Sequence, residues 1–309
     1  MFNFHRSAIR SIKPQNLKVI GLSVLSAIMI LILLFVSSKL IEEVMRNVEM
    51  TIMQAQIGGQ SNGMGNIVII LIAAFILISL LWILIGYPIF SSLVYYISKS
   101  MKDESVKIRD VFSSFAKERY PKAVLTGLSA LIIFILLLII RGVVSFLYAK
   151  LRNAIFSHMT NSLQSSDHSQ GFLITIQITD KVIASIISTV LMLFLFIIII
   201  NLTYSFVSDV KRSAGTNIKN AFRNIKNGHK TWFKFFIGLL LLWLIPIILN
   251  DIVAPLLGIA TMHSSQKLAL IIGSALNIIS ILIELVLIYL TLLAVTHYAH
   301  RHGERPTKD

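Results

Sequence analysis

The sequence predicts an all-α, polytopic transmembrane helical bundle of about six spans. Of its 309 residues, 56% are hydrophobic and 14% are charged, whereas ordinary soluble domains are about 45–50% apolar and about 25% charged. The apolar residues come in uncharged blocks, and roughly 20 helical residues are enough to cross a hydrocarbon core. No stretch between the blocks is long enough to build an independent soluble core. We therefore expect one integral membrane domain over residues 1–309.

Six apolar blocks define the predicted spans, at residues 19–38, 67–97, 123–140, 182–207, 235–250 and 268–298. The second block contains Gly86-Tyr87-Pro88 and the fifth contains Pro246. Because proline removes a backbone donor and its ring clashes with the preceding turn, we expect a kink or a break in each of these two helices. Beyond the first span, apolar residues keep a helical period up to a glycine-rich turn at 58–65, so this helix is expected to project from the bilayer.

Lys and Arg residues fall mainly on one side of the predicted spans. The N-terminal segment carries four, the loop from Lys99 to Lys122 seven, the loop from Lys211 to Lys234 seven and the tail three, which leaves seven of the 28 for the other side. Cytoplasmic loops hold the excess of positive charge. Both termini are therefore expected to lie in the cytoplasm.

Each of the two long cytoplasmic loops is predicted to form a basic amphipathic helix, near residues 105–119 and 215–228. Apolar residues stand at i, i+3, i+4 and i+7 in both loops, as Ile108, Val111, Phe112 and Phe115 in the first and Ile218, Ala221, Phe222 and Ile225 in the second. These positions share one face of an α-helix. A basic amphipathic helix can lie on a membrane surface and bind anionic headgroups, at about 1 kcal/mol for each cation near the surface.

The candidate lipid or partner contacts in these helices are Phe112, Phe115, Phe222, Lys107, Arg109, Lys219 and Arg223. We expect them to meet anionic headgroups of the cytoplasmic leaflet or another membrane protein. The alternative is that the cations serve topology alone. Nucleic acid is not an expected partner, because any inner membrane loop shows the same charge bias.

The sequence also contains a threefold internal pattern. A tyrosine precedes each basic helix at the end of a returning span (Tyr95, Tyr204), and a Gly-Leu pair opens the next span (Gly127-Leu128, Gly238-Leu239). The N-terminus repeats the tripeptide as Gly21-Leu22-Ser23, and the last span ends in Tyr298. We interpret this as three pseudo-repeated units, each a basic interfacial helix followed by a helical hairpin.

These features together resemble the membrane domain associated with glycerophosphodiester phosphodiesterases, and related six-helix bacterial membrane proteins. The resemblance rests on the Ile-x-x-x-Phe helices at Ile108–Phe112 and Ile218–Phe222, the Gly-Leu openings and the tyrosine-ended returning spans. We expect no soluble catalytic domain after Tyr298. The resemblance therefore implies a fold and a bacterial plasma membrane, and little about activity.

Glu284 is the one acidic residue predicted deep inside an uncharged block. With Asn277, Ser280 and Thr291 it falls on one helical face, at i, i+3, i+7 and i+14, so that a polar stripe points into the bundle. A charge at mid-bilayer costs roughly 2.5–3.5 kcal/mol on insertion scales, and such residues commonly mark substrate or proton pathways. The functional hypothesis is a substrate-binding stripe. The alternative is a protonated acid that bonds another helix and serves only packing.

Signatures of catalysis and metal binding are weak. The chain has no cysteine, and no phosphate-binding loop, His-Glu-x-x-His or Gly-x-Ser-x-Gly motif occurs. His297, His300 and His302 lack a converging cysteine or carboxylate, so their spacing favours an ordinary tail over a metal site. We expect no catalytic residues, no metal and no cofactor.

The leading functional hypothesis is a non-enzymatic membrane protein that handles or transports a lipid or small amphiphile in the cell envelope. Broken helices around a polar stripe are what such a pathway needs, although the repeats here run in parallel rather than inverted. The second hypothesis is a scaffold, a regulator or an immunity-type partner of another membrane complex. An intramembrane enzyme is the third.

Overall fold

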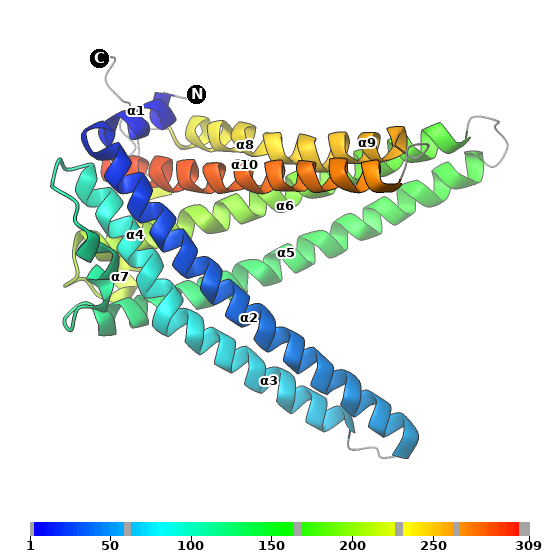
Figure 1. The fold of residues 1–309 in the computed structure, drawn as a ribbon, viewed down its shortest axis with the longest axis horizontal. Helices are drawn as coiled ribbons and strands as arrows, with labels where there is room; N and C mark the ends of the chain where they lie inside the picture. The colour runs from blue at the N-terminus through cyan, green and yellow to red at the C-terminus, as the bar shows by residue number, and fades with distance from the viewer. Residues whose placement is uncertain (1–2, 59–62, 164–168, 226–230, 262–265, 303–309) are drawn as a thin grey trace. The chain divides into compact units, whose positions relative to one another are not determined.

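The computed structural model describes residues 3–58, 63–163, 169–225, 231–261 and 266–302 (Figure 1). Throughout these residues the regular structure is helical, with no strand. Six helices are long and apolar enough to cross a membrane, at Asn16–Gln54, Gly65–Ser100, Tyr120–Ile155, Ile174–Ser208, Trp232–Ala260 and Lys267–His300. The all-α class is confirmed for these residues. Each of the six predicted blocks lies within one helix of sufficient length and hydropathy to span a membrane, and every helix extends beyond its predicted block. Part of the predicted 58–65 turn and the end of the predicted 215–228 helix lie outside the described residues.

The chain divides into two compact units. The first, called the α2–α4 unit here, comprises Arg10–Leu131 and Leu202–Asn220. The second, called the α8–α10 unit, comprises Met1–Ile9, Ile132–Asn201 and Ala221–Asp309. Two long helices, α5 (Tyr120–Leu163) and α6 (Ser169–Ser208), contribute residues to both units.

In the α2–α4 unit, the long helix α2 (Asn16–Gly58) lies along α3 (Gly63–Leu81) and α4 (Tyr87–Ser100) (Figure 1). Hydroxyl and indole groups join these largely apolar helices. The Tyr96 hydroxyl lies 3.2 Å from the Ser26 hydroxyl, and the Trp82 indole N–H donates to the Ser37 hydroxyl at 3.1 Å. In apolar surroundings such bonds hold helices together where hydrophobic burial alone gives no preference for a partner.

In the α8–α10 unit, α8 (Trp232–Ile248) and α9 (Ala254–Ala260) run beside α10 (Gln266–His300) (Figure 1). The short helix α1 (Asn3–Ser11) packs on the C-terminal end of α10 through aromatic rings. The rings of Phe235 and Tyr298 stack with centroids 4.4 Å apart, and Phe4 meets both edge-on. Offset and edge-to-face aromatic pairs of this kind add stabilisation beyond their buried area.

Two wide π-helical turns interrupt the spans, η2 (Trp82–Gly86) and η4 (Leu249–Val253). Each is followed by one residue and then a proline, Pro88 after η2 and Pro255 after η4. A π turn pairs each carbonyl with the N–H five residues on, and proline has no N–H to continue that pattern. The break predicted near Pro88 is therefore confirmed, as a π turn. Pro246 lies inside α8, so the helix does not break at that residue, and the interruption of this span precedes Pro255 instead.

The two segments predicted as basic amphipathic helices differ from each other. The second is α7 (Ala214–Ile225), an α-helix, but the first is η3 (Ile108–Phe115), a 3-10 helix. A 3-10 helix has about three residues per turn, so it aligns i with i+3 rather than with i+4 and i+7. Val111 and Ser114 are buried, whereas Ile108 is 74% exposed and Phe112 is 51% exposed. The predicted four-residue apolar face of the first helix is therefore wrong.

Candidate functional site

Glu284 lies near the middle of the 34-residue span Lys267–His300 and is half-buried. Its Oε1 accepts two hydrogen bonds, from the Asn250 amide at 3.3 Å and from the Ser280 hydroxyl, one helical turn earlier, at 3.4 Å. Among the described residues, no lysine, arginine or histidine forms an ion pair with Glu284. Neutral donors thus hold one of its oxygens, and the other is left for a further partner.

Asn250 and the adjacent Asp251 belong to the π turn η4, which is where the structure departs most from the predicted end of the fifth span. Asp251 is buried and pairs with Lys181 of α6, with 3.1 Å between its Oδ1 and the lysine Nζ. Lys181 also donates to the Asn250 carbonyl at 3.3 Å. In a π turn that carbonyl would pair with the N–H of residue 255, which is a proline. Lys181 therefore satisfies an acceptor that the backbone cannot.

A cavity of about 290 Å³ connects these groups within the α8–α10 unit. It lies among α6, α8 with η4, and α10. Its lining consists of Ser185, Ser188, Thr189, Trp243, Pro246, Ile247, Asn250, Asp251 and Glu284. The indole N–H of Trp243 donates to the Thr291 hydroxyl at 3.0 Å, so this ring is held in place beside the cavity. The cavity is smaller than most ligand pockets, and six of its nine lining residues are polar or charged.

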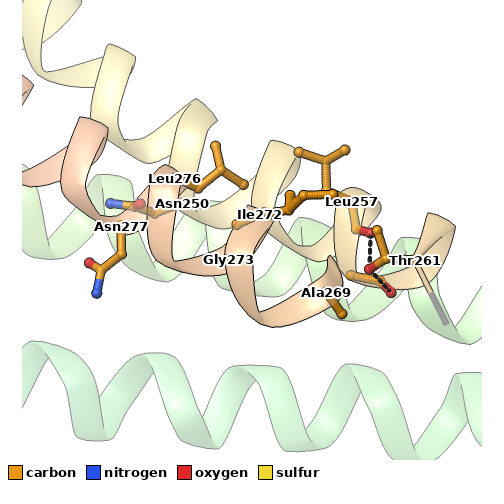
Figure 2. Close-up of a pocket in the computed structure, with 10 residues that line it drawn as sticks. Asn250, Leu257, Thr261, Ala269, Ile272, Gly273, Leu276 and Asn277 are labelled. Atoms are coloured by element: carbon orange, nitrogen blue, oxygen red, sulfur yellow. Dashed lines mark hydrogen bonds between the residues drawn. The ribbon is translucent and has the colours of Figure 1, made fainter. Parts of the chain in front are cut away.

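A second cavity of about 280 Å³ adjoins the first and shares Asn250 with it. Figure 2 shows it as a groove between α8–α9 and α10, with Asn250 and Asn277 at one end and Thr261 at the other. Most of the lining is apolar or small, from Ala254, Leu257, Gly258, Ala269, Ile272, Gly273 and Leu276. A Cβ added at Gly258 or Gly273 would meet no atom within 4 Å. These glycines therefore border open space instead of tight helix contacts.

The four residues of the predicted polar stripe on α10 do not all line the same cavity. Glu284 lines the first cavity and Ser280 bonds to it, as the shared face predicts. Asn277 is exposed and lines the second cavity, while Thr291 is buried and bonds to Trp243. The stripe thus divides between two cavities and a structural hydrogen bond.

Sequence reasoning missed Asn250, which bonds Glu284, and the ion pair of Lys181 with Asp251. It also missed the other polar and aromatic residues that line the cavity, which are Trp243, Ser185, Ser188 and Thr189. Two signals pointed to them. Ser185, Ser188 and Thr189 stand at i, i+3 and i+4, which is one face of α6. Pro255 stands one residue after the second π turn, just as Pro88 stands one residue after the first. This shared position of a proline marks a π turn inside a span that continues past Asp251.

The first cavity is electrostatically unbalanced. Lys181 neutralises Asp251, whereas the Glu284 carboxyl meets only neutral donors. A group that bears a positive charge or several hydrogen-bond donors would complement it. Arg141 of α5 lies elsewhere in this unit, where it is half-buried and contacts the sulfur of Met192 at 3.7 Å.

The predicted interfacial residues lie as follows. In α7, Ala221 and Asn217 are buried, and Asn217 accepts a hydrogen bond from Ser205 of α6 at 2.9 Å. Phe222, 46% exposed, and the exposed Lys219 and Arg223 face away from that contact. In η3, Phe112 and the neighbouring Lys107 and Arg109 are exposed, while Phe115 is half-buried and stacks on Tyr120. Both segments therefore present cations beside an exposed phenylalanine.

Within the described part of the chain, no group of three or more His, Asp or Glu side chains is arranged to hold a metal ion. Compared with models of known protein families, with curated proteins and with solved structures, the chain matches none. The six apolar helices define the chain as a multi-pass helical membrane protein by their length and composition.

Proposed function

We propose that this protein binds a lipid or small amphiphile in the cavity beside Glu284 and handles or transports it within the membrane, without enzymatic chemistry. The observation that carries the proposal is the cavity of about 290 Å³ lined by Glu284, Asp251 and Asn250 inside three apolar helices. Placing an ionisable side chain at this depth of a membrane costs free energy, and such side chains commonly have a function. If the hydrogen bond of Asn250 to Glu284 served only to pack the helices, it would not need an open space beside it.

The π turn supports the same proposal. Single π turns inside α-helices occur frequently at functional sites, and membrane transporters build substrate sites from interrupted helices. Here the turn presents Asn250 to Glu284 and Asp251 to Lys181. The interruption thus supplies two of the polar residues that line the cavity, Asn250 and Asp251.

The basic segments support contact with anionic headgroups. Lys107 and Arg109 precede Phe112 at the start of η3, and Lys219 and Arg223 flank Phe222 in α7, all of them exposed. An exposed phenylalanine beside cations suits the boundary between headgroups and acyl chains. We propose that both segments lie on the cytoplasmic leaflet of a plasma membrane, with both termini in the cytoplasm.

Three similar docking contacts support the proposed pseudo-repeat. Ser114 of η3 bonds Ser91 and Ser92 of α4, Asn217 of α7 bonds Ser205 of α6, and Ser7 of α1 bonds His297 of α10 at 3.4 Å. In each case a short interfacial segment packs on the C-terminal part of a returning span. We propose that α1, η3 and α7 are the equivalent first elements of three units.

The test is purification of the full chain in mild detergent, followed by identification of the co-purified lipids and proteins. Wild-type protein should retain an amphiphile that Glu284→Gln loses, while Glu49→Gln in α2, which lines neither cavity, should retain it. If both variants instead keep the same lipids and the same stoichiometric partner protein, the chain is a scaffold and the proposal fails.

A further inference from the structure

The two cavities of the α8–α10 unit meet at Asn250 and differ in character. The first contains the charged groups, and the second is an elongated groove with mostly apolar walls (Figure 2). Each has a volume close to 300 Å³. A single elongated molecule with one polar end can occupy both at once, with its polar end beside Glu284 and its apolar part between α9 and α10.

The sign of the charge selects the polar end. Asp251 is already neutralised by Lys181, which is held by a second bond to the Asn250 carbonyl. Both hydrogen bonds to Glu284 go to Oε1, so Oε2 is left to face a ligand. The hydroxyls of Ser185, Ser188 and Thr189 offer additional acceptors, and an indole beside a cation adds attraction.

From this arrangement we infer that the ligand is an amphiphile with an ammonium headgroup and one apolar chain. The ammonium group lies between Glu284 and the hydroxyl face of α6, and the chain lies in the groove past Gly258 and Gly273. This inference rests on the proposed function and names its substrate class. A phosphate-bearing headgroup is disfavoured, because it would bring negative charge to a cavity that already has an excess of it.

The probes are dodecylamine, dodecanol and dodecanoate, which share one chain and differ in the headgroup. The full chain in mild detergent is incubated with equal amounts of the three, and retained molecules are counted by native mass spectrometry. Wild-type protein should retain dodecylamine about tenfold better than the other two, as expected when a hydrogen bond to a charged group is gained. Glu284→Gln should lose this preference, whereas Glu49→Gln should keep it.

Two further variants separate the headgroup site from the groove. Glu284→Asp keeps the carboxylate and should keep the preference for the amine, which guards against loss of folding as the cause of any effect. Gly273→Leu adds a side chain into open space, so it should fold normally and reduce retention of all three probes to a similar extent.

The outcomes distinguish the two proposals. Equal retention of the three probes by wild-type protein overturns the ammonium headgroup but leaves amphiphile binding standing. Retention of none of them, with Gly273→Leu indistinguishable from wild type, overturns the proposed function as well. Displacement of dodecylamine by dioleoyl phosphatidylethanolamine would show a two-chain phospholipid and overturn the single-chain ligand.

Discussion

Lys181 of α6 bonds both the carboxylate and the backbone of the π turn in the fifth span, at 3.1 Å from Asp251 Oδ1 and 3.3 Å from the Asn250 carbonyl oxygen. The contact joins residues about seventy positions apart and fixes the turn that carries Asn250. Because Asn250 in turn donates to Glu284, one lysine orients the chain of groups that ends at the candidate site.

Replacing Lys181 by methionine should destabilise the protein. Asp251 is 8% exposed, so it would keep a buried charge without its partner. Lys181 itself is 55% exposed, and solvent therefore screens the pair and reduces the loss to about 1–2 kcal/mol. Thermal unfolding in detergent measures the effect, which the double variant Lys181→Met with Asp251→Asn should largely reverse. Lys39→Met, from the exposed pair with Glu42, is the control and should change little.

Gly127 and Gly21 begin identical Gly-Leu-Ser tripeptides but should respond differently to alanine. A Cβ at Gly127 would lie 3.0 Å from the ring of Tyr87, whereas a Cβ at Gly21 meets nothing within 4 Å. Gly127→Ala should therefore be destabilising, because overpacking against the buried Tyr87 costs about 1–3 kcal/mol and alanine's helix preference returns at most about 1 kcal/mol. Gly21→Ala should be neutral or stabilising, by up to about 1 kcal/mol, because alanine favours the helix. Similar melting temperatures for the two variants would contradict the close approach of α5 to Tyr87.

Acid should weaken the packing of α1. Burial, aided by the nearby N-terminal charge, lowers the pKa of His5 from 6.5 to about 4. Between these values the unfolded chain binds a proton that the folded chain does not, so stability is full above pH 6.5 and falls as the pH drops toward 4. The loss is about 1.4 kcal/mol for each pH unit inside that window.

Melting curves of wild type and His5→Phe at pH 7.5 and about pH 5 test this pH dependence. The phenylalanine can keep the ring contact with Phe235 but takes up no proton. The wild-type protein should lose more stability than the variant on acidification. Equal losses in the two proteins would mean that His5 does not carry the effect.

Removing the cations of α7 should weaken its contact with anionic lipid. Lys219→Gln with Arg223→Gln should reduce retention of phosphatidylglycerol in native mass spectra, at about 1 kcal/mol for each cation. The matched control is Lys39→Gln with Arg46→Gln, two cations that already pair with acids on α2. Equal retention by both double variants would mean that the α7 cations do not bind anionic lipid and serve only to set the orientation of the chain in the membrane.

The predicted orientation is tested by single thiols, since the chain contains no cysteine. A cysteine at Ser61 should react only with a membrane-impermeant reagent added from outside, and one at Lys117 only from the cytosol. The opposite pattern would reverse the orientation derived from the positive charges.

Hydropathy and charge alone determined the number of spans, their order and the placement of one acid in mid-span. These features depend on local composition, because a helix satisfies its own backbone and needs only an apolar surface to enter a bilayer. The π turn before Pro88 was likewise predictable as a break, from the missing N–H and the ring of a single proline.

Tertiary structure decided which side chains meet. Glu284 and Asn250 are 34 positions apart, and their contact depends on how α10 is rotated against α8 and η4. Apolar residues cover nearly every face of these helices, so the hydrophobic pattern does not single out the face that packs. The polar pair Asn250-Asp251 placed the predicted end of the fifth span too early, because the helix continues to Ala260. Only the packed structure brought Asp251 to Lys181 and opened a cavity beside Glu284.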